Sequence, residues 1–189
     1  MLNKTLTLKP RNEAQVILTY NGSLNGYNII LINANKCVIT GFTIINSEND
    51  RNIEGIKIDS NDNYIYNNTI LKNTYGIHIQ QNSNYNNITH NIIKDSYQGI
   101  WLYETRENYI FQNEMINNSD AGIKAKGSSS NIIRRNNFSY NFRGIYFCCG
   151  SFNNILYENS FIANSEAHVK GSSDNVWYYE NTGNYWDDY

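Results

Sequence analysis

A chain of 189 residues with 15 Lys and Arg against 17 Asp and Glu has a formal net charge of only −2 at pH 7. That balance provides no basic patch of the kind that binds nucleic acid. No apolar run approaches the roughly 20 residues of a membrane span, and the first residues lack the pattern of a secretory signal peptide.

The segment 1–35 lacks a clear repeat, although Val16–Leu18 and Ile29–Ile32 are apolar runs with the composition of strands. From Cys37 to Ile44 the sequence CVITGFTI already follows the second half of the repeat unit described below, with Gly41 in place of a corner Asn. We therefore expect lead-in strands over 1–35 and a region of repeats over 36–180.

Within the repeats, a glycine–isoleucine pair returns every 21 to 23 residues. The pairs are Gly55–Ile56, Gly76–Ile77, Gly99–Ile100, Gly122–Ile123 and Gly144–Ile145. Each unit also contributes one residue to an apolar column of Ile65, Ile88, Ile110, Ile133 and Leu156. A unit of about 22 residues is typical of a solenoid in which each repeat covers its neighbour's core. The sequence predicts an all-β fold: one right-handed parallel β-helix domain, with about 22–23 residues per rung and roughly six rungs.

Asparagine columns accompany the apolar one. Three residues after it stand Asn68, Asn91, Asn113, Asn136 and Asn159, and two residues before it stand Asn63, Asn86, Asn108, Asn131 and Asn154. Because like residues stack directly in a β-helix, an inward Asn at a corner can bond the Asn above and below it. Asn also tolerates the left-handed backbone that a tight corner needs. We expect the Asn68 set to form such a ladder.

The repeat ends where the aromatic sequence of residues 181–189, NTGNYWDDY, begins. A solenoid needs its terminal rung covered. We therefore expect a C-terminal cap over 181–189, in which Tyr185, Trp186 and Tyr189 fold over the last rung.

Several stretches together resemble NosD-type right-handed parallel β-helix proteins. They are NKTLTLK at Asn3–Lys9, the CVITGFTI rung, the N-x-I-x-x-N-x-I units with intervening Gly–Ile pairs, and the closing GNYWDDY. That family includes periplasmic copper-accessory proteins and archaeal surface proteins. The resemblance implies an extracytoplasmic location, whether secreted, at the cell surface or in the periplasm. Because members typically begin with a signal peptide and a capping helix, we also expect this chain to be a piece of a larger protein.

Residues beside the glycine pairs form two outward columns. The first is Lys57, His78, Trp101, Lys124, Tyr146 and His168, and the second is Asp59, Gln80, Tyr103, Lys126, Cys148 and Lys170. Aromatic faces pack on sugars while polar neighbours bond hydroxyls or carboxylates. The candidate carbohydrate-binding residues are therefore Lys57, His78, Trp101, Tyr103, Lys124 and Tyr146. The alternative is that large aromatics simply suit a sheet surface.

Catalysis on a glycan would need convergent acid and base groups. Asp59 has no carboxylate neighbour in its column, and Asp187 and Asp188 lie in the end segment. Arg135 and Glu158 share a column one rung apart, which predicts a surface ion pair. No catalytic residue is assigned. The sequence favours a non-catalytic scaffold that recognises carbohydrate, with a β-helix polysaccharide lyase or glycoside hydrolase as the alternative.

Copper would need clustered His, Met or Cys. His78 and His168 are four rungs apart, His90 belongs to another strand and Met115 to the apolar column, so we expect no copper or other cofactor in this segment. A NosD-like role in maturing a copper enzyme, nitrous oxide reductase, rests on the resemblance alone.

Three cysteines, Cys37, Cys148 and Cys149, are treated as small hydrophobes rather than a disulfide framework. Cys37 and Cys148 lie several rungs apart, beyond the ~7 Å limit for a bridge. Neighbouring residues of a strand point to opposite faces, which separates Cys148 from Cys149. The redox state of the three cysteines, the ligand and the oligomeric state stay open.

Overall fold

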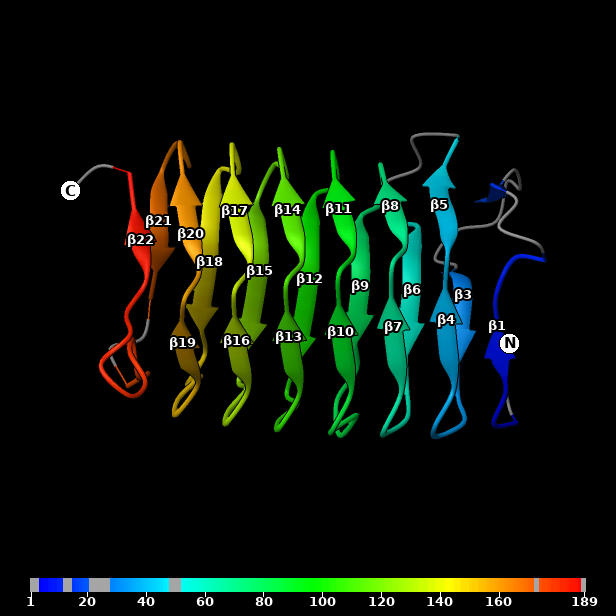
Figure 1. The fold of residues 1–189 in the computed structure, drawn as a ribbon, viewed down its shortest axis with the longest axis horizontal. Helices are drawn as coiled ribbons and strands as arrows, with labels where there is room; N and C mark the ends of the chain where they lie inside the picture. The colour runs from blue at the N-terminus through cyan, green and yellow to red at the C-terminus, as the bar shows by residue number, and fades with distance from the viewer. Residues whose placement is uncertain (1–3, 12–14, 21–27, 48–51, 172–173, 188–189) are drawn as a thin grey trace.

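The computed structural model describes residues 4–11, 15–20, 28–47, 52–171 and 174–187. In these residues the chain forms strands and no helix, and it winds as a right-handed parallel β-solenoid of about seven turns (Figure 1). Every full turn contributes one strand to each of three parallel sheets, which run the length of the molecule. The predicted fold class is confirmed.

The strands of the first sheet, in spatial order, are β1 (Thr7–Leu8), β4 (Val38–Thr40), β7 (Tyr64–Tyr66), β10 (Asn87–Thr89), β13 (Tyr109–Phe111), β16 (Ile132–Arg134) and β19 (Ile155–Tyr157). Those of the second are β2 (Val16–Tyr20), β5 (Phe42–Asn46), β8 (Thr69–Leu71), β11 (Ile92–Lys94), β14 (Glu114–Ile116), β17 (Asn137–Ser139), β20 (Ser160–Ile162) and β22 (Tyr185–Trp186). Those of the third are β3 (Asn28–Ile32), β6 (Glu54–Ile58), β9 (Tyr75–Ile79), β12 (Gln98–Tyr103), β15 (Ala121–Lys126), β18 (Arg143–Cys148) and β21 (Ala167–Lys170).

The solenoid has one turn more than the roughly six expected. The extra turn is β1, β2 and β3, which pair in parallel with β4, β5 and β6. This segment lacks the glycine pair and the asparagines of the repeat, so the sequence pattern does not reveal that it completes a turn.

The core is a set of apolar columns that run along the solenoid axis. Ile65, Ile88, Ile110, Ile133 and Leu156 stack in register and are fully buried, as expected. The glycines of the Gly–Ile pairs form a further column, at a place where the backbones of successive rungs approach one another closely. A Cβ atom on Gly99 would lie 2.5 Å from the carbonyl oxygen of Gly122, and the other glycines of the pairs meet the next rung at 2.4–2.8 Å. The glycines are therefore a packing requirement of the third sheet.

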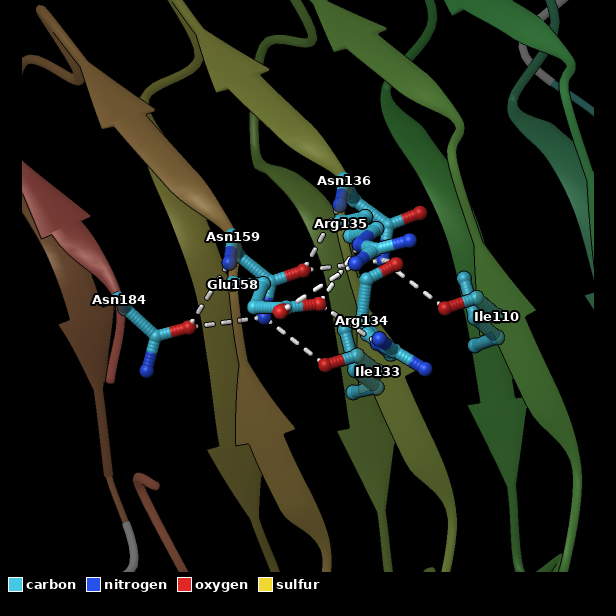
Figure 2. Close-up of polar contacts among 8 residues, drawn as sticks. All are labelled: Ile110, Ile133, Arg134, Arg135, Asn136, Glu158, Asn159 and Asn184. Atoms are coloured by element: carbon cyan, nitrogen blue, oxygen red, sulfur yellow. Dashed lines mark hydrogen bonds and ion pairs between the residues drawn. The ribbon is translucent and has the colours of Figure 1, made fainter. Parts of the chain in front are cut away.

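The predicted asparagine ladder is confirmed, and two further polar ladders run beside it. In the set Asn68, Asn91, Asn113, Asn136, Asn159 and Asn184, the backbone N–H and the Nδ2 group of each Asn both donate to Oδ1 of the next, at 2.9–3.1 Å. Figure 2 shows the last three members. The Asn63 set forms a second ladder that ends at Asn175. A third, not predicted, runs through Asn73, Ser96, Asn118, Asn141 and Asn164.

The left-handed residue at the second corner is not the ladder Asn itself but the residue before it. Those residues are Asn67, His90, Gln112, Arg135 and Glu158, with φ between 51° and 55°. The expectation that Asn is chosen for its tolerance of this conformation was wrong for the Asn68 set, because its members are needed for their buried amides. The left-handed residues differ in type since their side chains are outside the core.

At this corner the predicted pair of Arg135 and Glu158 is confirmed, and Arg134 joins it. Nε of each arginine donates to Oε2 of Glu158, at 2.6 Å from Arg135 and 2.7 Å from Arg134 (Figure 2). Hydrogen bonds from both arginines lower the pKa of the Glu158 carboxyl. The guanidinium of Arg134 also lies over the rings of Phe111 and Tyr157. The cluster thus connects side chains of three successive rungs on the outside of the first sheet.

At the C-terminal end, Trp186 in β22 stacks on Phe161, with ring centroids 4.5 Å apart and planes at 9°. β22 pairs in parallel with β20, so the chain here extends the second sheet. Tyr185 is 59% exposed. Tyr189 lies outside the described residues.

Candidate functional site

The residues predicted to bind carbohydrate lie on the outer face of the third sheet. Lys57, His78, Trp101, Lys124 and Tyr146 are register partners in successive strands, from β6 to β18. Tyr103 is the register partner of Lys126, which is the partner of Cys148. We call Lys57, His78, Trp101, Tyr103, Lys124 and Tyr146 the outer strip. The sequence alignment of repeats placed these six correctly relative to one another.

The assignment of His168 to this column was wrong. β21 pairs with β18 so that Lys170 is the partner of Tyr146 and Val169 that of Ile145. His168 therefore lies beside Gly144, where its Nε2 is 2.8 Å from Oδ1 of Asp187 and its Nδ1 is 3.1 Å from Nδ2 of Asn164. The last repeat lacks a glycine pair, so sequence alignment had no fixed point there.

His78 is the deepest member of the outer strip, with only 3% of its surface exposed. Its Nδ1 lies 3.0 Å from Oε1 of Glu54. Because a carboxylate can only accept, Nδ1 carries the proton in this contact. The ring stacks on Trp101 at a centroid distance of 4.2 Å, and its other contact is the edge of Tyr75 at 5.6 Å. Burial, followed by the charge of Glu54, raises the pKa of Tyr75.

The rings of the strip pack against neighbouring side chains of the same sheet, both in adjacent rungs and along one strand. Trp101 contacts His78 on one side and Tyr103 at 5.4 Å, while Lys124 and Arg143 lie over the ring of Tyr146. The strip therefore offers solvent the ring edges, hydroxyls and cationic groups more than the flat ring faces that the sequence hypothesis invoked.

Three carboxylates lie among the cations in and beside the strip, and the first, Glu54, is 3.9 Å from Nζ of Lys57. Asp120 contacts Arg143 at 2.5 Å and Lys124 at 3.6 Å, and it accepts a 2.6 Å hydrogen bond from Nε2 of Gln98. Glu166 pairs with Arg143 and with Lys170, and the bond from Lys170 is the first cause of the lowered pKa of its carboxyl. None of the ion pairs among the described residues involves Lys126, which lies over the ring of Tyr103 at 5.0 Å.

Several buried polar atoms around His78 have no hydrogen-bond partner among the described residues. They are Oε2 of Glu54, Nε2 of His78, Oε1 of Gln98 and Nε1 of Trp101. Buried polar atoms of folded proteins are nearly always paired, so such a group of orphans marks a place where the fold is not optimised for stability alone.

Sequence reasoning missed Glu54, Tyr75, Gln98 and Arg143. These residues directly precede the glycine of each repeat and pair with one another across the sheet, with Ala121 between the last two. Their common position was visible in the repeat. The column was not recognised in the sequence because a different residue type occupies this position in each repeat.

The strand alternation used to separate Cys148 from Cys149 ends before Cys149, and the three cysteines are free thiols in the structure. β18 ends at Cys148, and Cys149 is a left-handed corner residue with φ of 56°. The alternation of a strand therefore does not extend to Cys149. Burial, followed by the neighbouring Cys149 thiol, raises the pKa of Cys148 to about 11. Cys149 is exposed, whereas Cys37 is buried.

No group of three or more His, Cys, Asp or Glu in the described ranges is arranged to hold a metal ion. In the same residues, no helix combines the length and the apolar character needed to cross a bilayer.

A family profile described as "periplasmic copper-binding protein (NosD)" matches residues 11–189. The chain belongs to the NosD family. A search of curated proteins finds no match.

Solved structures similar to this NosD-family chain include one alginate epimerase and two mannuronan C-5 epimerases. A double mutant of the periplasmic alginate epimerase AlgG aligns with a TM-score of 0.62 and 24% identity, covering 77% of this chain and 36% of the epimerase. The A-module of the Azotobacter vinelandii mannuronan C-5 epimerase AlgE6 aligns at 0.61 and 15%, covering 91% and 58%. That of AlgE4 aligns at 0.62 and 13%, covering 86% and 50%. The chain thus spans between about a third and three-fifths of their lengths, and the likeness is one of fold.

Proposed function

We propose that this NosD-family chain is a non-catalytic, extracytoplasmic β-helix scaffold whose outer strip binds an acidic polysaccharide. The observation that carries the proposal is the local charge of the third sheet. In the part of this sheet from β15 to β21, Lys124, Lys126, Arg143 and Lys170 face two carboxylates, Asp120 and Glu166, so cations are in excess there although the chain as a whole has a net charge of −2. A local excess of one sign attracts a polymer of the other.

The geometry of the strip suits a linear polymer. Successive rungs lie ~4.8 Å apart, so a chain laid along the solenoid axis meets a new side chain at each rung. Hydroxyls of Tyr103 and Tyr146 and the ammonium groups of Lys124 and Lys126 supply donors for sugar hydroxyls and uronate carboxylates. The periplasmic description of the family and the three epimerases that act on alginate or mannuronan support an extracytoplasmic glycan as the ligand.

A glycan array tests this proposal. The wild type is expected to bind uronate-containing polymers, and the variant Trp101→Ala with Tyr146→Ala is expected to lose that binding. The matched control is Tyr64→Ala with Tyr178→Ala, which removes two more exposed rings, 51% and 64%, from other parts of the surface. Absence of binding by the wild type, or equal binding by both double variants, would overturn the proposal. Melting curves verify that each variant is folded.

One observation favours a catalytic alternative, in which the chain acts as a lyase or hydrolase. Glu54 holds His78 with Nδ1 protonated, which leaves Nε2 as a basic nitrogen next to the strip. Yet Nε2 is enclosed, and Trp101 would have to move before a substrate could reach it. Incubation with polyuronate, followed by assays for unsaturated products and new reducing ends, separates the two functions. Products that disappear in His78→Ala would place the chain among the enzymes.

A further inference from the structure

The outer strip differs chemically between its two halves. From β15 to β21 the cations outnumber the carboxylates beside them. From β6 to β12 they do not: Lys57 lies 3.9 Å from Oε2 of Glu54, and Asp59 directly follows β6. Because successive rungs are ~4.8 Å apart, a polymer laid along the solenoid axis crosses both halves and meets a different chemistry in each.

Four buried polar atoms of the β6–β12 half have no hydrogen-bond partner among the described residues, and their neighbours fix what each can do. Nδ1 of His78 donates to Glu54 at 3.0 Å, so Nε2 of the neutral ring can only accept. Nε2 of Gln98 donates to Oδ2 of Asp120 at 2.6 Å, which identifies the unpaired atom of that amide as its oxygen. Oε2 of Glu54 accepts, whereas Nε1 of Trp101 can only donate. We call these three acceptors and one donor the acceptor cluster, in which His78 and Gln98 are only 3% and 2% exposed.

The acceptor cluster discriminates among ligands by their hydrogen-bonding groups. A carboxylate only accepts, so a uronate would leave the three acceptors unpaired beside the charge of Glu54. A metal ion or an ammonium group would pair with the acceptors but not with the N–H of Trp101. A hydroxyl both donates and accepts, so neighbouring hydroxyls of one uncharged sugar unit match both kinds of group. Sites built from buried hydrogen-bonding groups reject ligands that leave those groups unpaired.

Trp101 controls access to the acceptor cluster. Its ring stacks on His78 at a centroid distance of 4.2 Å and contacts Tyr75 at 4.4 Å. The side chain lies on the outer face of β12 and is partly exposed, so it can turn toward solvent without disturbing the core. Its own N–H then gains a partner, because that atom is unpaired while the ring covers His78. A sugar unit that enters makes the hydrogen bonds that the enclosed atoms lack.

We propose that the acceptor cluster is a subsite for an uncharged, hydroxyl-bearing sugar unit, and that the ligand of the strip is an acidic heteropolysaccharide in which uronates alternate with such units. This inference rests on the proposed function, because the uronates must lie over the cations of β15 to β21. It adds the second class of sugar and the residues that select it.

The test compares two oligosaccharides of equal length by calorimetry on the full chain: one of uronate alone, and one that alternates uronate with an uncharged hexose. Wild type is expected to bind the alternating ligand about tenfold more tightly, the factor that one further hydrogen bond supplies, although this ligand carries less charge. Trp101→Phe, which keeps a ring and removes Nε1, and Gln98→Met, which removes Oε1, should each lower this ratio toward one. Gln112→Met, at an exposed position of the second corner, is the matched control and should keep the ratio.

Three results would contradict the subsite. Equal or tighter binding of the uronate ligand by wild type, or an undiminished ratio in either variant, would overturn it while leaving the proposed function in place. Wild type that binds neither ligand would overturn both. The fluorescence of Trp101, obtained as the difference between wild type and Trp101→Phe, should shift when the alternating ligand binds, and a preference without that shift would also refute the proposal. Melting curves verify that the variants are folded.

Discussion

The Asn68 ladder and the outer strip are both columns produced by stacking one repeat on the next, yet they differ in every chemical respect. In the ladder each position is the same residue, the side chains from Asn68 to Asn159 are buried, and each amide has partners in the neighbouring rungs. In the strip the successive residues are Lys, His, Trp, Lys and Tyr, and buried atoms of His78 and Trp101 lack hydrogen-bond partners in the described part of the chain.

The difference teaches how to divide the roles of residues in a solenoid. A column that the fold requires repeats its residue, because each rung presents the same demand. A column in which the residue changes at every rung meets no such demand, so its composition is free to serve recognition. We therefore expect changes in the glycine and Asn columns to reduce stability and changes in the strip to alter binding.

A substitution in the glycine column is expected to cause the largest loss of stability among the changes considered. In Gly99→Ala the new Cβ would meet the backbone oxygen of Gly122 at 2.5 Å, and a backbone atom cannot easily shift. We expect a loss of about 3 kcal/mol or more in the free energy of unfolding, at the upper end for overpacking. Gly183→Ala, where nothing lies within 4 Å, is the control and should change little. Urea unfolding compares them, and equal stabilities would contradict the packing account.

Removing one amide from the ladder should cost slightly less. Asn113→Ala deletes five hydrogen bonds and leaves the buried backbone N–H of Asn91 without the acceptor it has in the ladder. The expected loss is on the order of 3 kcal/mol, the upper end for an orphaned buried group. Asn87→Ala, on the outer face of β10, is the matched control. A ladder variant as stable as the control in urea unfolding would show that the stacked amides contribute little.

At the C-terminal end of the solenoid, two adjacent aromatic residues differ in burial and should therefore differ in their contribution to stability. Trp186 is half-buried on Phe161, whereas Tyr185 next to it is exposed. We expect Trp186→Ala to lose about 2 kcal/mol, less than the 3–5 of a fully buried Trp, and Tyr185→Ala to lose almost nothing. Light scattering should also detect association of Trp186→Ala as the last core column becomes exposed. Equal melting and no association in both variants would count against a capping role.

The ion pairs at the second corner should have the smallest effect, and one that depends on pH. The pKa of Glu158 is lower when folded than when unfolded, because Arg134 and Arg135 donate to the carboxylate. The unfolded chain then binds the proton first as pH falls, so the stabilisation is present above the ordinary carboxyl pKa of ~4.3 and is lost below it. The melting temperature of wild type should exceed that of Glu158→Gln at pH 7 and converge with it at low pH. A difference that persists unchanged into acid would refute the electrostatic account.

Columns that repeat one residue type could be predicted from the sequence, whereas columns whose residue changes at each rung could be predicted only in part. Ile65, Asn68 and Gly99 belong to columns of like residues, so the repeat gave their positions, and in the case of Asn68 its bonding. The third ladder was missed because Ser96 interrupts its asparagines. Glu54 was missed because its column changes residue at each rung, so that only the folded chain shows its carboxylate against His78. The misplacement of His168 and the end of the strand alternation before Cys149 have local causes: one residue stands in a repeat without the glycine pair, and the other beyond the end of its strand.

The most direct test of the central claim combines stability and binding in one pair of variants. Lys124→Ala with Lys126→Ala removes two cations from the third sheet, and Lys72→Ala with Lys94→Ala removes the same charge near the second. Affinity electrophoresis in gels containing polyuronate, with melting curves on the same samples, measures both properties. We predict that both pairs melt like wild type and that only the Lys124–Lys126 pair loses retardation. Equal retardation of the two pairs, or unfolding of the Lys124–Lys126 pair, would contradict the assignment of this column to recognition.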